Sequence, residues 1–171
     1  MRLVRVQGPS AVYLARLDGD DGEVVIPIVE QQPGPGRDPL RDAIAAGVDL
    51  AAAPAIAGEG SLAGEGGGSY TLLAPVVAPE KVLAIGLNYR DHARETGAEL
   101  PKAPILFTKT PNSIVGPGDA ITYSKDDSTR VDYEAELAVV IGRRCRRVSV
   151  EAALDAVLGY TVCNDVSARD V

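Results

Sequence analysis

Acidic residues alternate with apolar ones within the segment Val131–Ile141. Asp132, Glu134 and Glu136 lie two positions apart, so in an extended strand their side chains project from one face. Neighbours on that face are about 7 Å apart, and at an effective dielectric near 20 each ionised pair shielded from water repels by roughly 2 kcal/mol. A hard divalent cation would turn that repulsion into coordination, because Mg²⁺ and Mn²⁺ prefer oxygen ligands. The alternative is an exposed strand whose acidic face is only solvated, with Arg130 as a partner.

A further carboxylate, Asp165, follows a second apolar strand over Tyr160–Cys163. One excursion from strand through helix to strand would return the chain beside the acidic segment. Asp165 would then complete, with Glu134 and Glu136, a facial set of three ligands. The apolar continuation 137–141 favours a strand that enters the core. An Asx-type turn is the alternative role for Asp165.

A possible proton-transfer pair precedes these carboxylates. His92 is the only histidine, and Glu95 follows it by three residues, so in a helix over 88–96 the two side chains share a face. A Glu that accepts a hydrogen bond from an imidazole ring raises the basicity of the ring, which can then act as a general base. A surface His–Glu pair without such a role is the alternative. Lys109 ends the apolar strand Ile105–Lys109 and could pair with a substrate carboxylate, whereas most strand-end lysines face solvent.

Short strands separated by turn residues predict a small meander at the start of the chain, over Arg2–Gln7, Ala11–Leu17 and Glu23–Val29. Asp38 is placed to cap a short helix that begins at Pro39, runs to about Ala46 and has Gly47 past its end. Ala and Gly then dominate from Ala51 to Ser69, which predicts a flexible linker. We therefore expect a small N-terminal domain over residues 1–70 and a second domain over 71–171.

The second part of the chain carries further strand patterns and one helix pattern. Strands are predicted over Lys81–Leu87, Ile105–Lys109, Arg130–Ile141 and Tyr160–Cys163. A helix over Val150–Leu158 would begin after Ser149 and end at Gly159. Because strands predominate, the expected fold class is α+β, mainly β.

Composition excludes several classes of function. The net charge of −7 would repel a nucleic acid or an anionic membrane surface. The chain has no run of about 18 apolar residues, which a membrane span needs, so we expect a cytoplasmic protein with neither partner. With one histidine, the two cysteines Cys145 and Cys163 are too few for a Cys/His zinc site, and we expect both thiols to be buried or partly buried.

Four motifs in this order resemble the fumarylacetoacetate hydrolase family. They are Lys81-Val82-Leu83-Ala84-Ile85-Gly86-Leu87-Asn88-Tyr89 with His92 and Glu95, then Phe107-Thr108-Lys109-Thr110-Pro111, then Val131-Asp132-Tyr133-Glu134-Ala135-Glu136, then Gly159-Tyr160-Thr161-Val162-Cys163-Asn164-Asp165-Val166-Ser167-Ala168-Arg169-Asp170. The resemblance covers roughly residues 80 to 171. It implies a small N-terminal domain followed by part of a rolled mixed β-sheet.

The resemblance also implies a chemistry. Glu134, Glu136 and Asp165 would hold Mg²⁺ or Mn²⁺, with Ca²⁺ as a third candidate, and His92 with Glu95 would activate water. The expected reaction is C–C cleavage of a small diketo acid such as an acylpyruvate, in the setting of aromatic catabolism. Isomerisation of hydroxymuconate- or heptadienedioate-type acids, and decarboxylation of oxaloacetate-type acids, are the alternatives within the family.

The family's catalytic domain normally continues past the Ser-Ala-Arg-Asp motif, close to which this chain ends at Val171. The resemblance therefore implies the first part of that domain, with unpaired strand edges and exposed apolar surface. A homodimer, or completion by another chain, would cover such surface. A catalytically silent fragment or an interaction subunit is the alternative to an enzyme.

Overall fold

The computed structural model describes residues 1–22, 24–62 and 68–171, and the fold is α+β with strands predominating, as predicted. Its contacts divide the chain into two compact units. One unit comprises Met1–Ala43 and Val48–Gly118, and the other comprises Ile44–Gly47 and Asp119–Val171. The predicted domain boundary near residue 70 stays a prediction.

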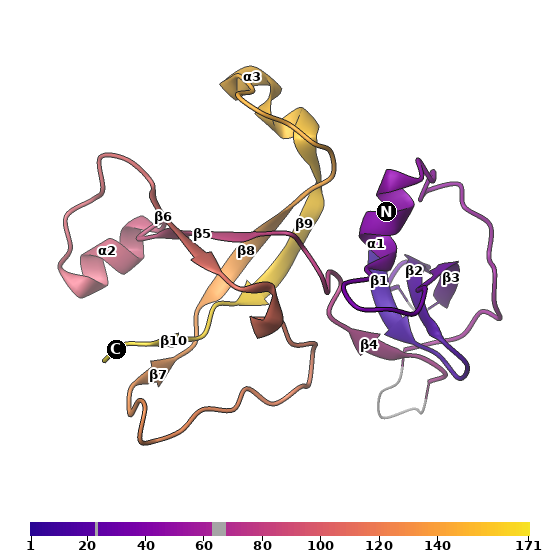
Figure 1. Ribbon diagram of the computed structural model, residues 1–171, viewed down its shortest axis with the longest axis horizontal. Helices are drawn as coiled ribbons and strands as arrows, with labels where there is room; N and C mark the ends of the chain where they lie inside the picture. Colours follow the sequence, from indigo (N-terminus) through magenta and orange to yellow (C-terminus); the bar gives the residue numbers. More distant parts are fainter. Residues whose placement is uncertain (23, 63–67) are drawn as a thin grey trace. The chain divides into compact units, whose positions relative to one another are not determined.

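The N-terminal meander forms a four-stranded antiparallel sheet in the order β3-β2-β1-β4 (Figure 1). Its strands are β1 Arg2–Gln7, β2 Val12–Asp18, β3 Val24–Glu30 and β4 Thr71–Leu73. Its strands contribute four residues to a buried core cluster that Tyr70 completes: Val6, Tyr13, Ala15 and Val25. The three predicted strands are confirmed, except that the predicted start at Glu23 lies outside the described residues. The short strand β4, which pairs with β1, was not predicted.

The cap of the first helix is confirmed. Helix α1 spans Pro39–Ala45, and Oδ1 of Asp38 accepts hydrogen bonds from the N–H groups of Leu40 and Arg41 at 3.0 and 3.2 Å. Its Oδ2 accepts two more from the backbone of residues 77–78. The carboxylate is completely buried, so it joins the start of the helix to a segment about forty residues away.

The predicted linker is only partly described, since residues 63–67 lie outside the described residues. Before that gap, Gly60 forms two backbone hydrogen bonds with Val25, at 2.8 and 3.3 Å. After it, Tyr70 joins the sheet core. The described ends of the predicted linker are therefore attached to the N-terminal sheet.

The first family motif lies on a strand and a helix. Strand β5 spans Val82–Gly86, helix α2 spans Arg90–Thr96, and strand β6 spans Ile105–Lys109 antiparallel to β5. Helix α2 ends at Gly97, whose φ of 67° is left-handed, a conformation that glycine adopts at little cost. A 3₁₀ turn follows at Pro111–Ser113. The two strands and the helical segment are confirmed.

The acidic motif lies where two strands meet. The predicted strand Arg130–Ile141 is in fact two, β7 Val131–Asp132 and β8 Ala135–Ile141, with Tyr133 and Glu134 outside both. Strand β8 pairs antiparallel with β9, Val157–Asn164, as a long ribbon (Figure 1). Strand β10, Ser167–Ala168, pairs with β7.

The predicted helix Val150–Leu158 is wrong at its end. The α-helix α3 covers only Val150–Ala153, and a 3₁₀ turn covers Leu154–Ala156. Its start is confirmed, because the Ser149 side chain accepts a hydrogen bond from the N–H of Ala152. The ladder with β8 takes over where the helix was expected to continue, since Ile141 pairs with Val157. Cross-strand pairing here overrides local helix propensity.

The family-matching part has almost no core of its own. In residues 81–171, all of which are described, only Ala93, Ser128 and Ala156 are buried. The prediction that β8 enters a core is wrong, because its apolar face is open, with Leu137, Val139 and Ile141 all about half exposed. Exposed apolar surface was expected from the resemblance, and it is present.

Two further findings concern side chains and helix length. Cys145 and Cys163 are both exposed, which corrects the prediction of buried thiols. Among the described residues, none of the helices combines the length and apolar character needed to cross a membrane.

Candidate metal centre

The backbone of Glu134 is held from both sides by the end of β9. Its N–H donates to Oδ1 of Asn164 at 3.0 Å, and its carbonyl oxygen accepts from the N–H of Asp165 at 2.9 Å. The antiparallel ladder continues from there, with Ala135 opposite Asn164 and Glu136 opposite Cys163. The three predicted ligands thus come from directly adjoining backbone, as the sequence predicts.

The pleat of the ladder explains why these side chains can share one face. Residues directly opposite each other in an antiparallel pair project to the same side, and every second residue does so along a strand. Glu136 therefore shares its face with residue 163 across the ladder, and Glu134 and Asp165 continue the same alternation just beyond the ends of β8 and β9. Glu134 is also well shielded, with 17% of its side chain exposed.

The carboxylates do not converge on one point. No group of three or more His, Cys, Asp or Glu side chains is close enough to hold a metal ion in the described part of the chain. Glu134 instead forms an ion pair with Arg169. The three carboxylates fit a hard divalent cation by their chemistry and by the placement of their backbone. In this structure, however, the carboxylate of Glu134 is neutralised by the guanidinium of Arg169.

Arg169 connects two of the acidic residues. Its guanidinium contacts Oε1 of Glu134 and binds Oδ2 of Asp132 through Nη2 at 3.1 Å and through Nε at 3.2 Å. The hydrogen bond to Asp132, followed by those to Glu134, raises the pKa of Arg169 above its ordinary value. The prediction that Arg130 pairs with the acidic face is wrong, because Arg169 forms these ion pairs. Arg130 contributes only its carbonyl oxygen, which accepts a hydrogen bond from the N–H of Arg169.

Asp170, next to Arg169, also bridges two segments. Its carboxylate accepts hydrogen bonds from the Ser128 hydroxyl and from the N–H and hydroxyl of Thr129. These bonds, that of Ser128 first, hold the pKa of Asp170 below its ordinary value. Together with the β7–β10 pairing, they fasten the end of the chain to the segment before the acidic motif.

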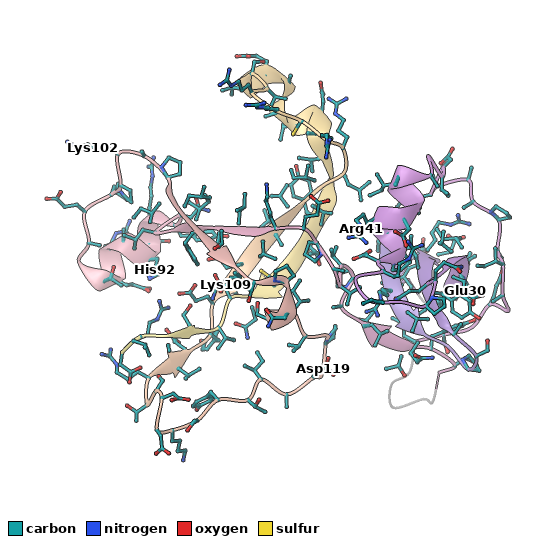
Figure 2. All side chains as sticks on the ribbon, in the orientation of Figure 1. Glu30, Arg41, His92, Lys102, Lys109 and Asp119 are labelled. Carbon is teal, nitrogen blue, oxygen red and sulfur yellow. The ribbon has the colours of Figure 1, made fainter. Side chains whose placement is uncertain are left out.

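The other predicted site residues lie in the first unit. Figure 2 shows His92 on helix α2 and Lys109 at the end of β6. His92 and Glu95 are three residues apart on α2, but no hydrogen bond joins their side chains in the described structure. The ammonium group of Lys109 lies 6.0 Å from the centre of the Phe107 ring, at the outer limit of a cation–π contact.

Two residues in the structural site were not predicted as part of it. Asn164 and Arg169 belong to the last of the four motifs but were given no role, yet both contact Glu134. The signal that was available is charge balance: a partly shielded cluster of carboxylates needs a cation nearby, and Arg169 is within the same motif as Asp165.

Comparisons with known proteins agree with the resemblance. A sequence profile described as fumarylacetoacetate (FAA) hydrolase C-terminal matches residues 81–171. A mitochondrial oxaloacetate tautomerase of Xenopus laevis is 52% identical over 102 residues, which are 60% of this chain and 32% of that protein. The matched part therefore spans about a third of that relative's length.

Solved structures share the fold. The 5-carboxymethyl-2-hydroxymuconate delta-isomerase of Mycobacterium smegmatis matches with a TM-score of 0.72 and 33% identity, covering 99% of this chain and 56% of that one. A maleylpyruvate hydrolase of a Sphingobium species, solved with manganese and pyruvate, matches with a TM-score of 0.68 over 100% of this chain and 60% of its own. At 24% identity, this second likeness concerns the fold alone.

Proposed function

Because the chain belongs to the fumarylacetoacetate hydrolase family, we propose that it is the metal-binding portion of an isomerase that interconverts the keto and enol forms of small oxaloacetate-type acids. The observation that carries this proposal is the 52% identity to an oxaloacetate tautomerase. The likeness to a hydroxymuconate isomerase supports the same class of reaction. These relatives favour the isomerase alternative over the C–C hydrolase that the motifs first suggested.

The reaction itself makes modest demands. In keto–enol exchange a proton leaves the carbon next to the carbonyl, a C=C bond forms between those two carbons, and the carbonyl oxygen gains a proton. No C–C bond breaks and no water is consumed. A site for this reaction needs a base beside the carbon that loses the proton and a source of positive charge beside the carbonyl oxygen. It also needs a cationic side chain to bind a carboxylate of the substrate.

We assign the positive charge to a divalent cation held by Glu134, Glu136 and Asp165. When bound, Mg²⁺ or Mn²⁺ would withdraw electron density from the carbonyl group and stabilise the negative charge that develops on its oxygen. The three carboxylates supply the oxygen ligands that such ions prefer, and Asn164 supports this role because it fixes the backbone of Glu134.

We assign proton transfer to His92 and Glu95. Imidazole titrates near neutral pH and is therefore suited to exchange a proton with carbon or oxygen. Glu95 would orient the ring by accepting its second N–H, a contact that must form on substrate binding. Lys109 would bind a substrate carboxylate, since a dicarboxylate must be attracted to a chain whose net charge is −7.

The test is enolisation of oxaloacetate by the purified chain. With Mn²⁺ present, we expect the ultraviolet absorbance of the enol to approach equilibrium faster than in buffer, and Glu134→Gln to abolish the acceleration. Arg144→Gln, at an exposed position beyond the end of β8 and outside the proposed site, is the control and should retain it. Pyruvate release from acetylpyruvate would instead favour the hydrolase, and no activity on either acid would favour a silent fragment.

Partners and location are also proposals. We propose another copy of the chain or a second polypeptide as a partner, because apolar strand faces are exposed. The cytoplasmic location stays a prediction, and the Xenopus relative is named as mitochondrial. Neither nucleic acid nor a membrane is proposed as a partner.

A further inference from the structure

The ion pair between Arg169 and Glu134 is partly shielded from solvent. The side chain of Arg169 is one-third exposed and that of Glu134 is 17% exposed. Ion pairs that are partly withdrawn from water are screened less than surface pairs and interact more strongly. In this structure Arg169 is the cation that balances Glu134.

The backbone around Arg169 holds its side chain in place. Its N–H donates to the carbonyl oxygen of Arg130 at 2.9 Å, and the preceding residues pair with β7. The following residue, Asp170, binds Ser128 and Thr129. The guanidinium therefore reaches the acidic motif from a fixed starting point.

Arg169 also has a second acceptor. Its Nε and Nη2 both bind Oδ2 of Asp132, while only Nη2 contacts Glu134. The guanidinium can therefore release Glu134 and keep two hydrogen bonds to Asp132. Release of Glu134 would leave its carboxylate available to another cation without leaving Arg169 unpaired.

We propose that Arg169 is the resident counter-cation of Glu134, and that a divalent cation binds by displacing its guanidinium from Glu134 while the hydrogen bonds to Asp132 remain. This inference rests on the metal site of the proposed function. A guanidinium and a divalent cation repel each other at contact distance, and both need the oxygen atoms of the same carboxylate. Arg169 is thus a positioning residue that holds the ligand in place and lowers the affinity for metal.

The experiment measures Mn²⁺ binding to the full chain from the electron paramagnetic resonance signal of free Mn²⁺, without any substrate. Removing the competitor in Arg169→Gln should tighten binding about tenfold, equivalent to about 1.4 kcal/mol. The same variant should melt at a lower temperature than wild type without metal, and Mn²⁺ should raise its melting temperature more than that of wild type.

Arg130→Gln is the matched control. It removes the same charge from the segment that pairs with Arg169 through its backbone, but its side chain forms no ion pair with Glu134 in the described structure. We expect its Mn²⁺ affinity to stay within about twofold of wild type, since its charge acts only through solvent. Arg169→Lys should bind Mn²⁺ about threefold more tightly than wild type, because an ammonium group lacks the planar set of N–H donors with which a guanidinium binds two carboxylates at once.

The outcomes separate the two proposals. Equal gains in Arg169→Gln and Arg130→Gln would show a general charge effect and overturn the displacement, as would an unchanged or weaker affinity in Arg169→Gln. If Arg169→Gln fails to fold, Arg169→Lys decides by the same comparison. Absence of Mn²⁺ binding in wild type and all variants would overturn the metal site itself, and this inference with it.

Discussion

The side-chain oxygen of Asn164 accepts a 3.0 Å hydrogen bond from the backbone N–H of Glu134, thirty residues earlier in the chain. This bond fixes one of the two proposed ligands, Glu134 and Asp165, that lie outside the strands. The carbonyl group of Glu134 is held as well, by the N–H of Asp165. The acidic motif is therefore positioned by its backbone, while its side chains remain able to change partners.

Asn164→Ala tests this positioning. Loss of one exposed hydrogen bond should lower the free energy of unfolding by about 0.5–1 kcal/mol, and amide exchange at Glu134 should become faster. We expect Asn164→Asp to lose less, because a carboxylate still accepts from the N–H. Hydrogen exchange followed by NMR measures both effects, and Asn112→Ala is the control. Unchanged exchange at Glu134 would contradict the role of Asn164.

Asp38→Ala should strongly destabilise the N-terminal unit. It removes a helix cap, worth about 1 kcal/mol, and leaves the N–H groups of Val77 and Ala78 without their acceptor. We expect a loss of about 2–4 kcal/mol in the free energy of unfolding, measured by urea denaturation. Asp91→Ala, an exposed carboxylate paired with Arg94, should change it by less than about 0.5 kcal/mol. Similar losses in both variants would refute the assigned role.

The lowered pKa of Asp170 should make the free energy of unfolding depend on pH. The Ser128 hydroxyl and then the Thr129 N–H lower the pKa of Asp170 below its ordinary value of 3.8. A carboxyl whose pKa is lower in the folded state contributes stability above its unfolded pKa, and this contribution is lost as the pH falls through the folded pKa. Ser128→Ala should raise the pKa of Asp170 towards 3.8, as measured by a carbon NMR titration.

The same variant should be less stable than wild type at pH 6, and the difference should shrink below about pH 4 as Asp170 becomes protonated in both proteins. Urea denaturation at pH 6 and pH 3 checks this. A constant difference at both values would mean that Ser128 acts through packing and not through the charge of Asp170.

The open apolar face of β8 and β9 predicts an unusual tolerance. Val162 is 79% exposed, so Val162→Ser should cost less than about 0.5 kcal/mol. Val25 is completely buried, and Val25→Ala should cost about 2 kcal/mol through lost burial and the cavity left behind. Urea denaturation at two protein concentrations gives both values. A large cost at Val162 that grows with concentration would indicate that another copy covers this face.

The elements that follow from neighbouring residues were predicted well. Asp38 caps α1, Ser149 begins α3 and the strand Ile105–Lys109 has its predicted bounds. Each depends on a few consecutive side chains and on backbone preferences that the sequence states directly. The predicted helix to Leu158 failed because Val157 pairs with Ile141 of β8. The unbroken strand through Glu134 failed because the N–H of Glu134 binds the side chain of Asn164 and not a backbone carbonyl group.

The sequence by itself determined the family, the fold class and the kinds of side chain at the candidate site, since these depend on motifs and on short-range patterns. Only the tertiary structure decided which groups meet. That Asn164 holds the backbone of Glu134, that Arg169 rather than Arg130 pairs with its carboxylate, and that Leu137 faces solvent all depend on strand register and on burial. Those properties arise from residues far apart in the chain, and no local pattern records them.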